Sequence, residues 1–398
     1  MNEQLIIKNF GPITDMDVVI KAFTVFIGPQ GSGKSTAAKV LTICRDLSWY
    51  LQILDRDINV KEPFKKFCID EYFKDNTYIK YQNKNGSLDV IYENGEFKLD
   101  TKDVALQQAK EALSSRIYAE NKALLEKIGF KDINNKIDEK YKPMLHANSR
   151  MMLYIPAERN LAGVMSKSLA SMILAKIPIY DALIEYMSVF EKAKYEFADY
   201  YVPFLNVTFS INEGQEKVWI GKGDDKREPL PLQSCSSGLQ SVLPLLMSID
   251  YSLKANCFDT FAIEEPEQNL YPSNQRELVY RLVEICNDTK TNGMLLTTHS
   301  PYILSCMNVV LLAGLLKKNA AIQQEVDAIV GSNHYMKTSD VAVYNLNPSA
   351  DKYCKNLKNP KTGLIGVNEL DLVSEFIGED YDRLYRLYNQ NLRNKTWQ

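Results

Sequence analysis

A glycine-rich loop near the start of the chain is the feature that most limits how this sequence can fold. The segment Gly28–Ser35 reads Gly-Pro-Gln-Gly-Ser-Gly-Lys-Ser and matches the pattern G-x-x-x-x-G-K-S in full. It follows the apolar run Phe23–Ile27, which suits a strand buried on both faces. A helical stretch follows, from about Ser35 to Leu54. Strand, loop and helix in this order predict a nucleotide-binding α/β domain.

The residue types of this loop each have a chemical reason. Glycines let backbone N–H groups curve around phosphates, and the following helix points its positive end toward them. We expect the Lys34 ammonium to reach the β- and γ-phosphates and the Ser35 hydroxyl to bind Mg²⁺. The predicted nucleotide-binding residues of the loop are Gly28, Pro29, Gln30, Gly31, Ser32, Gly33, Lys34, Ser35 and Thr36.

Two later strand ends carry polar residues that can face the same phosphates. The apolar run Thr260–Ile263 leads into Glu264 and Glu265. One carboxylate at such a position can hold Mg²⁺ while its neighbour polarises water, and an ordinary strand exit is the alternative. His299 follows the apolar run Met294–Thr298 and could reach a γ-phosphate, although a lone histidine is more often structural.

The segment Ser236–Gln240 opens another predicted helix. A Ser-Gly pair at a helix N-terminus can cradle a phosphate, or it can be a simple helix cap. The sequence therefore leaves both interpretations open for Ser237 and Gly238.

The remaining elements are predicted from periodicity and turn residues. Met16–Ile20 and Phe23–Ile27 are separated by two residues, which predicts a hairpin, and Asn-Gly turns predict an antiparallel meander. The other predicted strands are Leu5–Lys8, Tyr78–Gln82, Ser87–Glu93, Glu96–Leu99, Met151–Pro156, Phe204–Asn212, Glu216–Lys222, Thr260–Glu264 and Met294–Thr298. The other predicted helical stretches are Thr101–Arg150, Leu161–Tyr200, Leu232–Leu253 and Pro272–Ile285.

The composition excludes a disordered, a collagen-like or a disulfide-framework protein. The chain is 45% hydrophobic and 24% charged, which is ordinary for a globular protein. Its net charge of -3 means that the chain as a whole is not basic, so the overall charge does not indicate nucleic-acid binding. Val309–Leu316 is too short to span a bilayer, and Met1–Phe10 lacks the apolar core of a signal peptide. The seven cysteines form no Cys-x-x-Cys pair, so we expect reduced thiols and a cytoplasmic protein.

The order of these motifs resembles the head of ABC-type ATPases, and most closely the RecF/SMC/OLD-like branch. Ile7–Ile13 resembles the first strand and turn of that branch, Glu264–Pro272 its Walker B and D-loop, and Thr297–Pro301 its His switch. The resemblance covers about residues 1–55 and 150–310. It implies an α/β fold, namely an ABC-type P-loop ATPase head with an antiparallel β subdomain and an inserted helical lobe.

The resemblance also implies a role for each candidate residue, with ATP and Mg²⁺ as cofactors. Glu264 would support the metal together with Ser35, and Glu265 would be the catalytic base, assisted by His299. Ser237 and Gly238 would touch the γ-phosphate of ATP held by a second copy of the chain. We therefore expect head-to-tail homo-oligomers.

Three positions depart from the pattern of the family. The signature reads Ser-Ser-Gly-Leu-Gln instead of Leu-Ser-Gly-Gly-Gln, and Walker B starts with Glu264 instead of Asp. No glutamine stands at the expected Q-loop. Glu158 follows a strand at that place and is a possible equivalent, and a simple strand-to-lobe turn is the equal alternative.

These assignments predict a division of the chain into five parts. Residues 1–55 and 236–310 would form the ATPase core, residues 56–150 a β meander with a helical insertion, residues 151–235 a strand and helical lobe, and residues 311–398 a C-terminal α/β extension.

For the function, the resemblance favours the ATPase subunits of bacterial anti-phage systems of the PARIS or Septu type. Such a subunit would act as sensor or scaffold for a separate effector, a nuclease or toxin. The alternative is a RecF/SMC-like DNA-repair ATPase that binds DNA directly, which the net charge does not support. The long inserted lobe argues against a transporter subunit. We expect no nuclease in this chain, because Glu379–Asp382 is the nearest acidic cluster after His299 and lies in a helical pattern.

Overall fold

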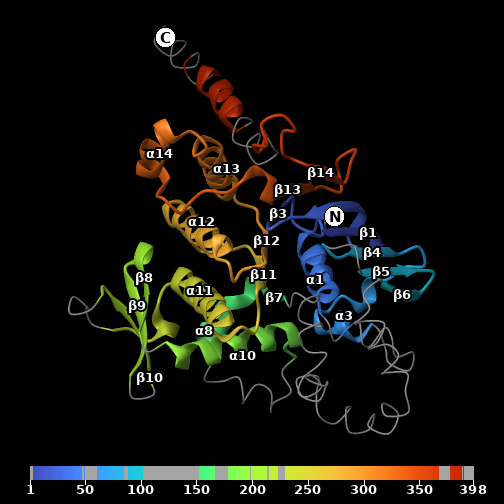
Figure 1. Ribbon diagram of the computed structural model, residues 1–398, viewed down its shortest axis with the longest axis horizontal. Coiled ribbons are helices and arrows are strands. Elements are labelled where there is room, and N and C mark those ends of the chain that lie inside the picture. The colour runs from blue at the N-terminus through green and yellow to red at the C-terminus, as the bar shows by residue number, and fades with distance from the viewer. Residues whose placement is uncertain are drawn as a thin grey trace, which may run out of the picture.

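The computed structural model describes residues 3–46, 49, 61–84, 88–101, 152–165, 178–197, 199–212, 215–222, 229–366, 377–387 and 389. In this part of the chain, strands form three sheets of six, five and three strands (Figure 1). The predicted α/β fold is confirmed. The helices of the main body are α1 (Lys34–Cys44), α3 (Glu62–Lys66), α8 (Asn160–Met165), α10 (Asp181–Glu196), α11 (Ser237–Ala255), α12 (Pro272–Asn287), α13 (Pro301–Leu316) and α14 (Gln323–Val330).

The six-stranded sheet is the centre of the molecule, and its order is β14-β13-β3-β12-β11-β7. Its strands are β3 (Phe23–Ile27), β7 (Met152–Ile155), β11 (Thr260–Glu264), β12 (Gly293–Thr297), β13 (Val341–Leu346) and β14 (Cys354–Asn356). All neighbours are parallel except β14, which is antiparallel to β13. β3, β7, β11, β12 and β13 are buried at every residue, as their continuous apolar runs require. The carboxyl ends of these five strands therefore meet at one edge.

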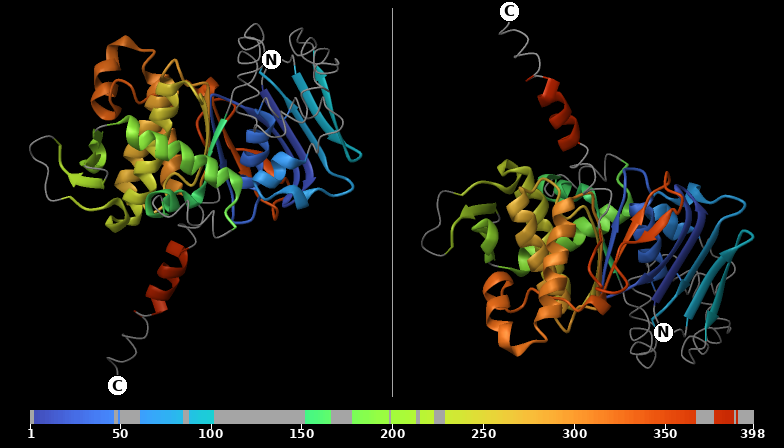
Figure 2. Two further views of the ribbon diagram at one scale, coloured as in Figure 1. Left: turned by 90° about the horizontal axis from the view of Figure 1, so that it is seen from below. Right: turned by 90° about the horizontal axis from the view of Figure 1, so that it is seen from above.

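Two different layers cover this sheet (Figure 2). Side chains alternate along β3, so that Val25 packs with the cluster of α10–α13 while Phe26 packs with the cluster of α1 and the five-stranded sheet. The helical layer lies on one side of the central strands and the antiparallel sheet with α1 on the other. The P-loop helix is thus buried between two sheets.

The five-stranded sheet corrects one prediction. Its order is β2-β1-β4-β5-β6, with β1 (Glu3–Phe10), β2 (Ile13–Ile20), β4 (Tyr78–Gln82), β5 (Leu88–Glu93) and β6 (Glu96–Thr101). β2 pairs with β1 and not with β3, so the predicted hairpin of Met16–Ile20 with Phe23–Ile27 is wrong. The fully buried β3 pairs with β12 and β13 instead.

The predicted meander β4-β5-β6 is confirmed, and it adds to β1. Asn94 and Gly95 have φ of 52° and 86°, as a type I′ turn requires. The other predicted Asn-Gly turn, at residues 85–86, and the predicted helical stretch after Thr101 lie outside the described residues.

The three-stranded sheet, β10-β9-β8, contains one strand that we did not predict. β8 (Asp199–Val202) pairs with β9 (Val207–Asn212), which pairs with β10 (Gln215–Ile220). The predicted helix Leu161–Tyr200 is therefore wrong at its end, because Tyr200 and Val202, two residues apart in β8, both pack against the helical core from one face of this sheet. α10 lies within that prediction, α8 begins one residue before it, and residues 166–177 lie outside the described part.

The C-terminal part contributes α13, α14, β13 and β14 to the body of the molecule, and a last helix, residues 377–387, stands away from it (Figure 1). None of the helices in the described ranges is long and apolar enough to span a membrane. The predicted helix Leu232–Leu253 begins later, at Ser237, because the Ser236 side chain caps it.

Candidate ATP site

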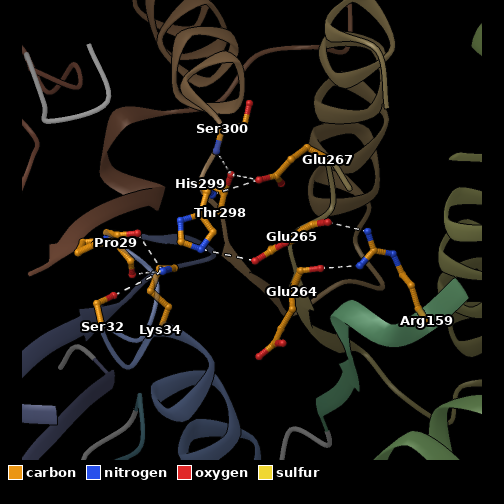
Figure 3. A network of polar contacts seen from close by, with 11 residues as sticks. Pro29, Ser32, Lys34, Arg159, Glu264, Glu265, Glu267, Thr298, His299 and Ser300 are labelled. Atoms are coloured by element: carbon orange, nitrogen blue, oxygen red, sulfur yellow. Dashed lines mark hydrogen bonds and ion pairs between the residues drawn. The ribbon is translucent and has the colours of Figure 1, made fainter. Parts of the chain in front are cut away.

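The phosphate loop lies between β3 and α1, as predicted. Lys34 folds back over the loop, and its Nζ donates to the Gly28 oxygen at 2.9 Å and to the Pro29 oxygen at 2.8 Å (Figure 3). Gln30 and Gly31 are exposed, whereas Ser32 and Thr36 are buried. The loop is therefore open on one side and fixed to the core on the other.

Burial lowers the pKa of the Lys34 ammonium to about 8, although Glu265, Glu264 and Glu267 raise it. In the structure this ammonium is held by carbonyl oxygens and by no ion pair among the described residues. An anionic phosphate in the loop would give the ammonium an ion-pair partner at contact distance, which none of the described residues supplies.

Glu264 ends β11 and is 6% exposed. Burial raises the pKa of this carboxyl, while hydrogen bonds from the hydroxyls of Tyr154 and Ser35 lower it. Its Oε1 is buried and has no hydrogen-bond partner among the described residues. An unpartnered carboxylate oxygen beside the Ser35 hydroxyl is a donor set that suits Mg²⁺. These two residues therefore fit the metal that the sequence predicts.

Glu265 follows with a positive φ of 41°, and Figure 3 shows its side chain pointing away from that of Glu264. Its Oε1 lies 3.5 Å from Nε2 of His299, and Figure 3 shows the imidazole between Glu265 and Lys34. Burial and the Lys34 charge lower the pKa of His299 below its ordinary value, which favours the neutral form of the ring. A carboxyl group and an imidazole thus lie beside the phosphate loop.

Glu267 holds the backbone next to His299 in place, a role that the sequence analysis did not predict. Its Oε1 accepts from the Thr298 hydroxyl at 2.6 Å and from the His299 backbone N–H at 3.1 Å. The Thr298 hydroxyl in turn accepts from the Ser300 backbone N–H at 2.9 Å. The carboxylate therefore fixes the backbone that presents His299.

Glu158 and Arg159 follow β7 in a short 3₁₀ turn, η2 (Ala157–Arg159). Glu158 accepts from the Tyr180 hydroxyl at 2.9 Å. Arg159 points toward Walker B and donates to backbone oxygens of Glu264 and Glu265, each at 2.6 Å (Figure 3). We did not predict a role for Arg159, and the signal that the sequence offers is its place three residues after the predicted strand Met151–Pro156.

Ser237 and Gly238 open α11, and Ser237 is exposed. Within the described residues, no hydrogen bond joins Ser237 to the phosphate loop of its own chain. A Cβ on Gly238 would lie 2.7 Å from the Asn269 oxygen, so only glycine allows this close approach between α11 and the D-loop. The amide of Gln240 donates to the oxygens of Gln233 and Cys235 and holds the preceding turn.

The predicted site residues thus fall into two groups. The phosphate loop, Glu264, Glu265 and His299 lie together at the carboxyl edge of the central sheet. Glu158 does not contact Glu264 directly among the described residues, but two tyrosines lie between them: Tyr180 hydrogen-bonds to Glu158, and Tyr154 hydrogen-bonds to Glu264. Ser237 stands at a separate, exposed position. The roles assigned to these residues remain predictions.

Comparison with known proteins supports the ATPase assignment. Residues 1–304 match the family described as AAA ATPase domain. No curated protein matches the sequence. Similar solved structures include an SMC head domain from Thermotoga maritima, at 11% identity and a TM-score of 0.38, over 77% of this chain and 92% of that one.

Two further similar structures are Smc heads bound to ScpA. One is an SmcHead bound to the C-winged helix domain of ScpA, with 15% identity, a TM-score of 0.34, and coverage of 76% of this chain and 90% of that one. The other is a head with an extended coiled coil bound to the C-terminal domain of ScpA from Pyrococcus furiosus, with 14% identity, a TM-score of 0.33 and the same coverage, 76% and 90%. The family match extends over most of the chain, so this protein belongs to the AAA ATPase domain family and is an ATP-binding P-loop ATPase.

Proposed function

We propose that two copies of this chain bind two ATP molecules head to tail and hydrolyse them, with Glu265 as the base. The observation that carries this proposal is the exposed Ser237 at the N-terminus of α11, which has no partner at the phosphate loop of its own chain. A second copy, turned by a two-fold axis, would place that helix end over the γ-phosphate.

Each residue has a chemical task in this arrangement. Lys34 and the loop N–H groups bind the phosphates, and Ser35 with Glu264 would hold Mg²⁺, which neutralises charge on the phosphate oxygens when bound. Glu265 accepts the proton of the attacking water. Neutral His299 would lie within reach of the γ-phosphate, and its Nε2, 3.5 Å from Oε1 of Glu265, orients that carboxylate.

The Glu265→Gln variant tests this assignment. The amide keeps the size of the side chain but cannot accept the proton, so we expect hydrolysis to fall by about 10²–10⁴ while ATP still binds. The variant should form a dimer in ATP that light scattering detects as a doubled mass. A hydrolysis rate equal to that of the wild type would refute Glu265 as the base.

Ser237→Arg in the Glu265→Gln background tests the head-to-tail contact. The larger charged side chain should remove the ATP-dependent dimer without reducing ATP binding, because the phosphate loop is unchanged. Ser332→Arg is the matched control, since Ser332 is also an exposed serine and lies next to α14. Loss of the dimer in both variants would argue against a specific contact at Ser237.

We further propose that this ATPase cycle controls a separate effector in bacterial anti-phage defence, with no nuclease in this chain. The support is the resemblance of its motifs to PARIS- and Septu-type ATPases. Co-purification of a small nuclease-like or toxin-like protein, encoded by a neighbouring gene, would support this role. Retention of DNA by the pure protein at moderate salt would favour the DNA-repair alternative instead.

A further inference from the structure

Arg159 is a fully buried cation whose hydrogen bonds go to the backbone of Walker B. It is 0% exposed, and no ion pair within the described residues includes it. Its Nη1 donates to the Glu264 oxygen at 2.6 Å and its Nη2 to the Glu265 oxygen at 2.6 Å. Nη1 also contacts the Pro156 oxygen at 3.2 Å. One planar guanidinium thus bridges two consecutive carbonyl groups of Walker B.

Burying the Arg159 charge without a carboxylate partner in the described part of the chain costs free energy of desolvation. A buried arginine normally pairs with a carboxylate, because desolvating its charge costs free energy. The Arg159 Nε has no hydrogen-bond partner among the described residues, and burial lowers the pKa of the group. A buried charge without a carboxylate partner is weak evidence of a purely stabilising role.

The two carbonyl groups that Arg159 holds belong to a strained backbone. Glu265 has a φ of 41°, a left-handed conformation that a residue with a side chain adopts at a free-energy cost. The Glu265 N–H is fixed by the Thr297 oxygen at 2.8 Å, and the Glu265 oxygen also accepts from the Gln268 N–H at 2.9 Å. Together with these bonds, Arg159 fixes the backbone before and after the Glu265 side chain, which is the proposed base.

The segment that carries Arg159 also contacts α11, the helix that begins at Ser237. Arg159 ends η2, directly before α8. A Cβ on Gly163 of α8 would lie 3.3 Å from the Gln240 oxygen, so α8 packs closely on the first turns of α11. The backbone of Walker B is therefore connected, through one arginine and one short helix, to the end of α11 where Ser237 stands.

We propose that Arg159 is a positioning residue for hydrolysis, which holds the backbone of Glu264 and Glu265 in the conformation that aims the Glu265 carboxylate at the site. This inference rests on the proposed role of Glu265. It predicts that loss of the guanidinium changes kcat and leaves the binding of ATP to the phosphate loop almost unchanged, because Lys34 and Ser35 lie on α1 and its loop.

The test compares two buried arginines. Arg159→Met removes the donors but keeps most of the volume, and Arg159→Lys keeps the charge but replaces the two Nη donors of the planar guanidinium by a single nitrogen. Arg45→Met is the matched control, because Arg45 is 3% exposed and pairs with Glu3 away from the ATP site. Each variant is measured for its folded fraction, its ATP affinity and its ATPase rate per folded molecule.

We expect Arg159→Met to lower kcat about 10–100-fold, as misplacement of a catalytic group does, with KM within about threefold of wild type. Arg159→Lys should fall between Arg159→Met and wild type. Arg45→Met should lose stability but keep its kcat per folded molecule. If Arg159→Met does not fold, Arg159→Lys alone decides the question.

A wild-type kcat per folded molecule in the Arg159 variants, or a change in KM alone, would overturn the inference. Glu265→Gln, measured beside them, separates the two proposals. An active Glu265→Gln protein would refute the base itself. An inactive Glu265→Gln protein with fully active Arg159 variants would refute only the positioning role.

Discussion

The phosphate loop and the Walker B end of β11 are positioned in different ways. Lys34 bonds to Gly28, Pro29 and Ser32, all within six residues of it. The backbone of Glu264, in contrast, is held by Arg159, 105 residues away in the chain. One half of the site is built by its own short motif and the other half by distant segments. A short motif thus indicates binding of phosphate more directly than it indicates the geometry of catalysis.

The sharpest way to break this comparison is a substitution at Gly28. Its φ is 141°, and an added Cβ would lie 2.0 Å from the Leu346 oxygen of β13. We expect Gly28→Ala to lower the free energy of unfolding by about 3 kcal/mol or more and to impair ATP binding. Urea unfolding and nucleotide titration would measure both effects.

Gly31→Ala is the matched control for that change. Gly31 also has a positive φ, 73°, but nothing lies within 4 Å of the added Cβ. It should therefore cost only about 1 kcal/mol, from backbone strain alone. Equal losses in both variants would mean that contact with β13 does not shape the loop.

Lys34→Ala should come next in the size of its effect. Charge-assisted hydrogen bonds to phosphates contribute about 1.5–3 kcal/mol each, so the affinity for ATP should fall about 100-fold. The thermal unfolding temperature should stay close to that of the wild type, because the buried ammonium has no ion pair among the described residues. Unchanged affinity for ATP would contradict the assignment of the phosphate loop.

Tyr353→Phe tests whether the phosphate loop is as independent as the comparison suggests. The Tyr353 hydroxyl, from the segment between β13 and β14, donates to the Ser32 oxygen. Its loss should cost about 1 kcal/mol of stability and weaken ATP binding a few-fold. Tyr344→Phe is the control, since that hydroxyl contacts the Val19 oxygen and should affect stability only. Equal ATP affinity in both variants would make the loop independent of this contact.

The smallest expected effect is a change in how stability depends on pH. The pKa of His299 is lower in the folded state than its ordinary value of 6.5. The unfolded chain therefore binds the proton first as pH falls, and this contribution to stability is lost below about pH 6.5. Urea unfolding of wild type and His299→Asn from about pH 7.5 to about pH 5.5 should show a steeper loss in the wild type. Parallel curves would contradict a lowered pKa.

Much of the core could be predicted from sequence, because buried parallel strands are continuous apolar runs. Phe23–Ile27 and Thr260–Glu264 were predicted with the bounds that the structure has. The hairpin failed because a two-residue gap between Ile20 and Phe23 fits a crossover between sheets as well as a turn. Arg159 was missed because its partners are backbone oxygens, which leave no mark in the sequence.

The place of β13 beside β3 has a practical consequence for anyone who shortens this chain. The family match ends at residue 304, but β13 begins at Val341 and pairs with every residue of β3. A chain cut at 304 would leave the backbone N–H and C=O groups of β3 unpaired on that side, and open sheet edges of this kind promote aggregation. It would also remove the Leu346 oxygen behind Gly28 and the Tyr353 hydroxyl at Ser32. The smallest unit that we expect to stay soluble and bind ATP therefore includes β13 and β14, and ends no earlier than about residue 366.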